Sequence, residues 1–234
     1  MKQICFAISL ILANTTVCQN ILVQFEVRNL DKVNTAELLI NDTISLFKVS
    51  LINSDNKSNN TFFIKNKIEN TAYFNERILN QNVYVTDSIY LMKWELLSDT
   101  TMILNEKCLS AKTVFRGRSY IAYYSPKFRV DEGPWKFGGL PGLILSIESE
   151  DNFIEWNATK IIENYSHKII PENISSYKFI GWTEFVTLYK QTIERFIKAT
   201  RSSGKVANEM SAKIKIDAVE IFYPELQTGE GIKF

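Results

Sequence analysis

Short segments in which apolar and polar residues alternate follow one another along most of the chain, and they constrain the fold more than any other feature. In residues 21–28, Val23, Phe25 and Val27 fall on one face and the polar residues between them on the other. This period of two is typical of a strand with one buried face. Turn-forming residues separate such segments at a spacing of about ten residues, which predicts a mainly β fold: an antiparallel meander forming a curved sheet, a sandwich or a half-barrel. Further strands are expected at 37–51, 61–65, 90–97, 101–104, 108–115, 118–124, 143–148 and 153–161, with a turn at 98–100. Residues 71–87 are ambiguous, although 83–85 favour a strand.

Residues 183–203 interrupt this alternation and predict one C-terminal amphipathic helix. Thr183 can cap its start, and Gly204 can take the left-handed conformation that ends a helix. We expect its apolar stripe to cover one face of the sheet, while its basic side either faces solvent or touches anionic lipid or a partner. Beyond it, residues 212–222 alternate again and are a candidate for a last strand. The stripe consists of Phe185, Leu188, Tyr189, Thr192, Phe196 and Ile197.

The start of the chain has the layout of a secretory signal peptide. Lys2 provides a positive charge, residues 4–13 form an apolar run, and short residues stand at 16–18 before Gln19. The run is too short to span a bilayer, and no later run approaches eighteen apolar residues. We therefore expect no transmembrane segment in the mature chain.

Acylation at Cys18 is disfavoured by the residues before it. Thr15 and Val17 stand where lipoprotein motifs usually have a leucine and a very small residue. The sequence thus predicts a signal peptide at 1–18 and a single domain at 19–234. The mature protein is therefore expected to be exported.

Composition excludes several classes of function. Lys and Arg number 27 and Asp and Glu 26, so the net charge of +1 gives no basic surface for nucleic acid, and we expect no nucleic-acid partner. Three cysteines and one histidine exclude a disulfide framework and a Cys-rich or multi-histidine metal centre. We expect neither a metal nor a cofactor.

The strongest catalytic hypothesis pairs Cys108 as a nucleophile with His167 as its base. A thiolate forms near neutral pH only beside a base or a positive charge, and a hydrolase could use such a pair. Against this, Cys108 opens a predicted strand, where a free cysteine commonly behaves as a small buried hydrophobe. His167 lies in a polar segment that is predicted to be a loop.

Glycine and proline are concentrated in residues 133–142, which contain four of the nine glycines and two of the five prolines. Pro141 followed by Gly142 is the preferred central pair of a type II turn, which would bring Leu140 and Leu143 side by side as an apolar knob. The segment lacks the Gly-Lys-Ser/Thr ending of a phosphate-binding loop. Two interpretations remain open: a turn that fills the core, or a recognition loop with an apolar tip. The residues of this motif are Gly133, Pro134, Gly138, Gly139, Leu140, Pro141, Gly142, Leu143 and Ile144.

Residues 139–144 spell Gly-Leu-Pro-Gly-Leu-Ile, and the segment resembles the motif of the GLPGLI family of secreted or cell-envelope proteins from diderm bacteria. The resemblance extends over the central part of the chain, in the order Trp94, Cys108 with Ala111, Gly117-Arg118, Tyr123-Tyr124, Gly133-Pro134 and Phe137. It implies the extent of the domain and a location at the cell envelope, in the periplasm, at the outer membrane or outside the cell. It assigns no activity.

Aromatic and basic side chains near the motif suggest binding. Tyr, Trp and Arg carry much of the energy of interfaces, although aromatic residues on a strand can equally pack over neighbouring strands. We expect an exported, non-catalytic binding or interaction module whose partner is a protein, a peptide or an apolar ligand. The alternatives are the Cys108 hydrolase and a half-barrel that carries an apolar ligand. The candidate binding residues are Arg118, Tyr120, Tyr124, Trp135 and Phe137.

Overall fold

The structure is a computed structural model that describes residues 20–30, 32–50, 61–166, 174–202 and 219–222. The predicted signal peptide, His167, Gly204 and residues 212–218 lie outside the described residues.

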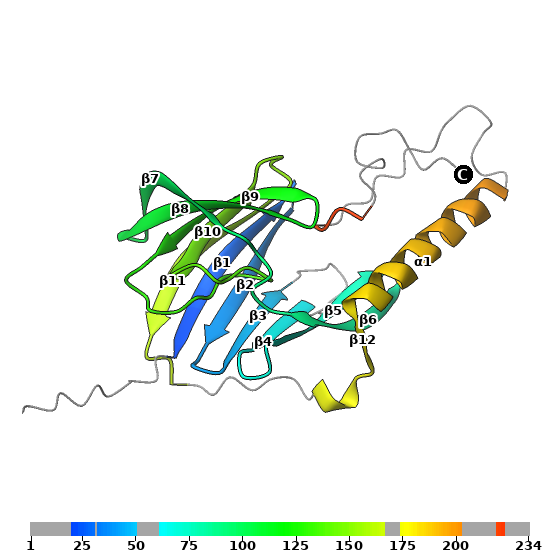
Figure 1. The fold of residues 1–234 in the computed structure, drawn as a ribbon, viewed down its shortest axis with the longest axis horizontal. Helices are drawn as coiled ribbons and strands as arrows, with labels where there is room; N and C mark the ends of the chain where they lie inside the picture. Colours follow the sequence, from blue (N-terminus) through cyan, green and yellow to red (C-terminus); the bar gives the residue numbers. More distant parts are fainter. Residues whose placement is uncertain (1–19, 31, 51–60, 167–173, 203–218, 223–234) are drawn as a thin grey trace, which may run out of the picture.

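Within these residues, twelve strands form one curved open sheet, so the predicted mainly β fold with a curved antiparallel sheet is confirmed (Figure 1). Neighbouring strands are antiparallel, except that β12 runs parallel to β6. Their order across the sheet is β12-β6-β5-β4-β3-β2-β1-β11-β10-β9-β8-β7. The strands are β1 (Ile21–Asn29), β2 (Lys32–Ile40), β3 (Ile44–Ser50), β4 (Thr61–Asn66), β5 (Thr71–Ile78), β6 (Gln81–Ser88), β7 (Glu95–Ile103), β8 (Glu106–Phe115), β9 (Arg118–Ser125), β10 (Leu143–Ser149), β11 (Ile154–Glu163) and β12 (Phe179–Gly181), and a 3-10 turn covers Ile174–Ser176.

Residues 37–51, predicted as one strand, belong instead to the hairpin of β2 and β3. The turn is made by Asn41, whose Oδ1 accepts hydrogen bonds from the backbone amides of Thr43 (2.9 Å) and Ile44 (2.7 Å). Such a side-chain bond reverses the chain inside an otherwise apolar run. The prediction of a single strand is therefore wrong.

The segment 90–97 and the turn at 98–100 also differ from the prediction. Strand β7 begins only at Glu95 and continues through 98–100. Its pairing with β8 shifts register between Leu96 and Thr100, so the polar residues between them form a bulge in an edge strand rather than a turn between two strands.

Helix α1 (Trp182–Ser202) confirms the predicted helix to within one residue at each end. Phe185, Tyr189, Ile193 and Ile197 are buried at intervals of four residues, whereas Phe196 is exposed. The helix packs against β6 and β12 at one edge of the sheet and continues beyond it, instead of lying across a face (Figure 1).

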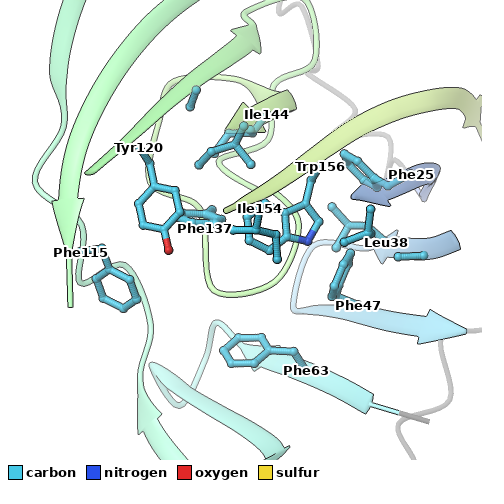
Figure 2. Close-up of a cluster of buried hydrophobic side chains, with 14 of the residues drawn as sticks. Phe25, Leu38, Phe47, Phe63, Phe115, Tyr120, Phe137, Ile144, Ile154 and Trp156 are labelled. Atoms are coloured by element: carbon cyan, nitrogen blue, oxygen red, sulfur yellow. The ribbon is translucent and has the colours of Figure 1, made fainter. Parts of the chain in front are cut away.

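The main core lies on the concave side of the sheet, where side chains from both halves converge (Figure 2). Phe25 of β1 meets Phe47 of β3 with ring centroids 6.4 Å apart, and Phe63 of β4 meets Phe74 of β5 at 4.9 Å. Because side chains alternate along a strand, the opposite face of β3 and β4 carries a second, smaller cluster. It consists of Leu46, Phe62 and Ile64, with Ile174 and Tyr177 packed against it.

Candidate functional site

The candidate site is the glycine-rich loop between β9 and β10, residues 126–142, which folds into the concave side of the sheet. Phe137 has no exposed surface. Its ring centroid lies 4.8 Å from that of Tyr120 on β9 and 5.4 Å from that of Trp156 on β11 (Figure 2). The loop therefore supplies the side chain at the centre of the aromatic core.

Backbone hydrogen bonds fix the shape of this loop. The amide of Phe137 donates to the carbonyl of Pro134 (3.1 Å), with Trp135 at a φ of 51°. The amide of Gly139 then donates to the carbonyl of Asp131 (2.8 Å), which closes the loop on itself. A Cβ atom at Gly138 would lie 2.8 Å from that same carbonyl oxygen, so this close approach requires glycine.

The motif turn differs from the predicted type II turn. The amide of Gly142 donates to the carbonyl of Leu140 (2.8 Å), which makes a three-residue turn centred on Pro141. Gly142 has a φ of 155°, and a Cβ atom there would lie 2.4 Å from the carbonyl oxygen of Ser125. Leu140 and Leu143 are both buried, so the motif is part of the core.

A buried ion pair fastens the start of the loop to the sheet. The ammonium group of Lys65 on β4 donates to Glu132 Oε2 (2.9 Å) and to the carbonyls of Gly133 (3.2 Å) and Phe137 (2.5 Å). The hydroxyl of Ser45 donates to the same carboxylate oxygen (2.9 Å), and Lys67 approaches the other oxygen at 3.2 Å. Every donor of the buried Lys65 is thus satisfied.

The charge state of Glu132 follows from these contacts. Burial acts to raise the pKa of Glu132, but the charges of Lys65 and Lys67 and the hydrogen bonds from Lys65 and Ser45 outweigh it and hold the pKa below its usual range. The Glu132 carboxylate is therefore ionised at neutral pH, and its contacts tie the loop to β4 and β3.

A second charge cluster joins the middle of the loop, at Lys136, to residues 219–222. Glu220 Oε1 accepts hydrogen bonds from Lys136 Nζ (2.7 Å) and Arg116 Nη1 (2.6 Å), and Arg116 also pairs with Asp87. The Trp182 ring at the start of α1 lies 3.3 Å from the Arg116 guanidinium carbon and 4.6 Å from Lys136 Nζ, measured from the ring centroid. The cluster therefore connects β6, the β8–β9 turn, the loop and the helix.

Glu76 on β5 completes this cluster, with its Oε1 3.7 Å from Lys136 Nζ. Three carboxylates, those of Glu76, Asp87 and Glu220, then share two cations. Burial and the nearby Glu220 raise the pKa of Glu76 to about 7, against the opposing effects of Lys136 and Arg116. Glu76 consequently takes up a proton near neutral pH.

The structure brings the predicted binding residues together, but in the interior. Arg118, Tyr120, Tyr124 and Phe137 are each at most 3% exposed. Arg118 donates to Asp151 Oδ2 (2.9 Å) and to the carbonyl of Val219 (2.6 Å), and its guanidinium carbon lies 4.0 Å from the centroid of the Phe153 ring. Trp135 is partly buried and stacks on Trp156 with ring centroids 5.9 Å apart. These side chains contact one another and the strands around them.

Cys108 is also buried, with no exposed surface. Burial raises the pKa of its thiol to about 11, so the thiolate is scarce near neutral pH. Its proposed base, His167, lies outside the described residues.

The interior space next to the second charge cluster is small. A cavity of about 10 Å³ lies beside Phe63, Ile89, Phe115 and Lys136, which is room for a single water. Within the described ranges, no group of three His, Cys, Asp or Glu side chains is arranged to hold a metal ion. In the same ranges, no helix has the length and hydropathy needed to cross a membrane.

Sequence reasoning missed three charged residues of these clusters, namely Lys65, Lys136 and Glu220. One local signal was available: Lys65 stands two residues after Phe63, on the same face of β4. A lysine on a buried face needs a buried acceptor, and the sequence does not say which acid supplies it.

Comparison with known proteins gives a fold and no family. No family model and no curated protein matches the chain. Two crystal structures of PNGF-II, in space groups C2 and P21, match 75% and 74% of this chain at 17% and 16% identity, with TM-scores of 0.54 and 0.56. The chain spans about a third of the length of PNGF-II, 32% and 34% in the two structures, and the likeness is one of fold alone. A chain of the Pseudomonas aeruginosa MucA/MucB complex matches 68% of this chain, over 56% of its own length, at 6% identity and a TM-score of 0.37, too low to establish a common fold.

Proposed function

We propose that this protein is an exported, non-catalytic binding module of the bacterial cell envelope and a member of the GLPGLI family. The observation that carries the proposal is that the loop of the motif fills the concave side of the sheet with its own Phe137 and Leu140. The position where a substrate or carried ligand would sit in a curved sheet is thereby occupied by the chain itself. Recognition then takes place on the outer surface.

The state of the interior polar groups supports the same proposal. Glu132 and Lys65 are paired with each other, and Arg116, Lys136 and Glu220 are held in one cluster. A catalytic group needs a vacant position beside it for a reacting atom. Cys108 has a buried thiol with a raised pKa, which does not suit a nucleophile.

Export is proposed from the sequence. The charged start, the apolar run at 4–13 and the short residues at 16–18 match a signal peptide, and the motif at 139–144 resembles a family of envelope proteins. A protein, a peptide and an apolar ligand are the three partner classes that fit this location.

Thiol modification and native mass spectrometry test the proposal on protein purified from the periplasm of a diderm host that expresses the full chain. We expect the mature chain to begin at Gln19 and to show the mass of the polypeptide alone. Cys108 should resist iodoacetamide at pH 7.5 in the folded protein and react once guanidinium unfolds it. Rapid alkylation of the folded protein would favour the hydrolase, and a co-purifying apolar mass would favour the carrier.

A further inference from the structure

The two edge strands of the sheet differ in length and in how far other elements cover them. Strand β12 has three residues, pairs with β6 and continues directly into helix α1, which packs against both strands. Strand β7 has nine residues and pairs with β8 on one side, and within the described residues no strand lies on its other side (Figure 1). Proteins usually shorten or cover their edge strands, because unpaired amide and carbonyl groups can pair with another chain.

Side chains of β8 hold this edge in place. The hydroxyl of Ser110 donates to the carbonyl of Asp99 (2.8 Å) inside the bulge, and the hydroxyl of Thr113 donates to the carbonyl of Lys93 (2.9 Å) just before the strand. The pairing is regular again from Thr100 to Ile103. The edge is therefore formed before any partner arrives, which lowers the entropic cost of binding.

Exposed apolar side chains accompany these backbone groups. Leu96 and Met102 are 61% and 63% exposed. They pair with Ala111 and Lys107, two odd-numbered positions of β8, so both lie on the same face of the sheet as the half-buried Leu109. Backbone groups and apolar side chains together are what an added strand needs for affinity and specificity.

We infer that the outer edge of β7 binds an extended segment of a partner protein, which adds to the sheet as a further strand. This inference rests on the proposed binding function and names its surface. The exposed Asp99 favours a segment with a Lys or Arg beside apolar residues. A second copy of this chain fits less well, because two copies of Asp99 would approach each other in an antiparallel pair centred on that residue.

The test uses a fluorescein-labelled synthetic peptide that copies β8 (Glu106–Phe115, with serine in place of Cys108), since this sequence already pairs with β7 in the fold. Anisotropy measures its binding to the mature chain. In two further peptides, every second backbone nitrogen is methylated, at odd-numbered positions in one peptide and at even-numbered positions in the other. Because successive amides of a strand point to opposite sides, each peptide lacks the N–H donors of one edge. We expect one N-methylated peptide to lose binding and the other to keep it; equal binding of both would overturn the inference.

Two variants locate the contact. Met102→Lys places a charge beside the edge and should weaken peptide binding about tenfold, whereas Val114→Lys, on the opposite face of β8, should leave it within about twofold. Equal effects of the two variants would refute the assignment to β7. Sedimentation should show a monomer at about 100 μM, and a dimer that Met102→Lys dissociates would assign the edge to a second copy.

Failure of this inference differs from failure of the proposed function. A photo-crosslinking residue at Val114 or at position 102 reports which face touches a partner in the host envelope. Crosslinks only from Val114, without peptide binding, would remove the β7 edge and leave the binding function in place.

Discussion

Replacing Gly142 by alanine should be among the most damaging single-methyl changes in the protein. The new Cβ would lie 2.4 Å from the carbonyl oxygen of Ser125, 2.8 Å from its carbonyl carbon and 3.0 Å from the Cα of Pro126. All three are backbone atoms, so the junction of β9 and β10 must open by about 0.6 Å or more instead of a side chain turning aside. Overpacking of this kind costs about 1–3 kcal/mol, and the left-handed φ of 155° adds about 1 kcal/mol.

The expected loss is therefore about 3 kcal/mol of the free energy of unfolding, or a fall in Tm of about 6–12 °C for a chain of this size. Urea unfolding of the mature chain, followed by tryptophan fluorescence, measures it. Gly142→Val adds β-branching at the same position and should be worse.

Two other glycines serve as controls. A Cβ atom at Gly181 meets nothing within 4 Å, so Gly181→Ala should change stability by no more than about 0.5 kcal/mol. At Gly139 the nearest atom is 3.7 Å away and only the φ of 83° is unfavourable, which predicts a loss of about 1 kcal/mol. If Gly142→Ala is no more destabilising than Gly181→Ala, the close approach at Ser125 does not exist.

Two further predictions concern the charge clusters. Lys65→Met leaves Glu132 buried with Lys67, Ser45 and Tyr90 beside it but without its buried counter-ion, and should cost about 3 kcal/mol in urea unfolding. Lys67→Met removes a partly exposed amine and should cost about 1 kcal/mol or less.

Glu76→Gln should flatten the dependence of stability on pH. The pKa of Glu76 is raised from 4.5 to about 7, so the folded chain binds more protons than the unfolded chain in this interval, and the free energy of unfolding falls as the pH rises through it.

The size of the pH effect is bounded by the shift and by exposure. The shift in the pKa of Glu76 corresponds to at most about 3 kcal/mol of the free energy of unfolding. The effect is smaller than this limit, because 31% of the Glu76 side chain is exposed to solvent. Glu132 affects stability in the opposite direction, because its pKa is lowered in the folded chain. Its contribution to the free energy of unfolding is lost as the pH falls into the acid range, below the range in which Glu76 titrates. Equal slopes for the wild type and Glu76→Gln between pH 5 and 8 would show that Glu76 titrates normally.

Sequence periodicity predicted most of the sheet because alternation is a local property. Strand β9 was expected at 118–124 and is found at Arg118–Ser125, and β10 was expected at 143–148 and is found at Leu143–Ser149. The errors occur where one polar side chain overrides the pattern. Asn41 turns the chain inside an apolar run, and Ser110 holds a bulge at 98–100 that looks like a turn in the sequence.

The candidate site was only partly predictable, for a different reason. The glycine and proline content of residues 133–142 identified the loop, because backbone conformations leave a local signature. Its partners leave none: Lys65 lies 67 residues from Glu132, and Arg116 lies 104 residues from Glu220. Pairings at such separations depend on how strands from both halves of the chain meet in one sheet.

The placement of the two charge clusters explains how an apolar loop takes one position in an aromatic core. Apolar contacts are nondirectional, so Phe137 alone could pack against the surrounding rings in several ways. Glu132 is bound to Lys65 at the start of the loop, and Lys136 is bound to Glu220 one residue before Phe137. A displaced loop would leave a buried charge without its partner, which costs several kcal/mol. The ion pairs therefore select among packings that the core alone would not distinguish, and in doing so they keep the concave side of the sheet filled.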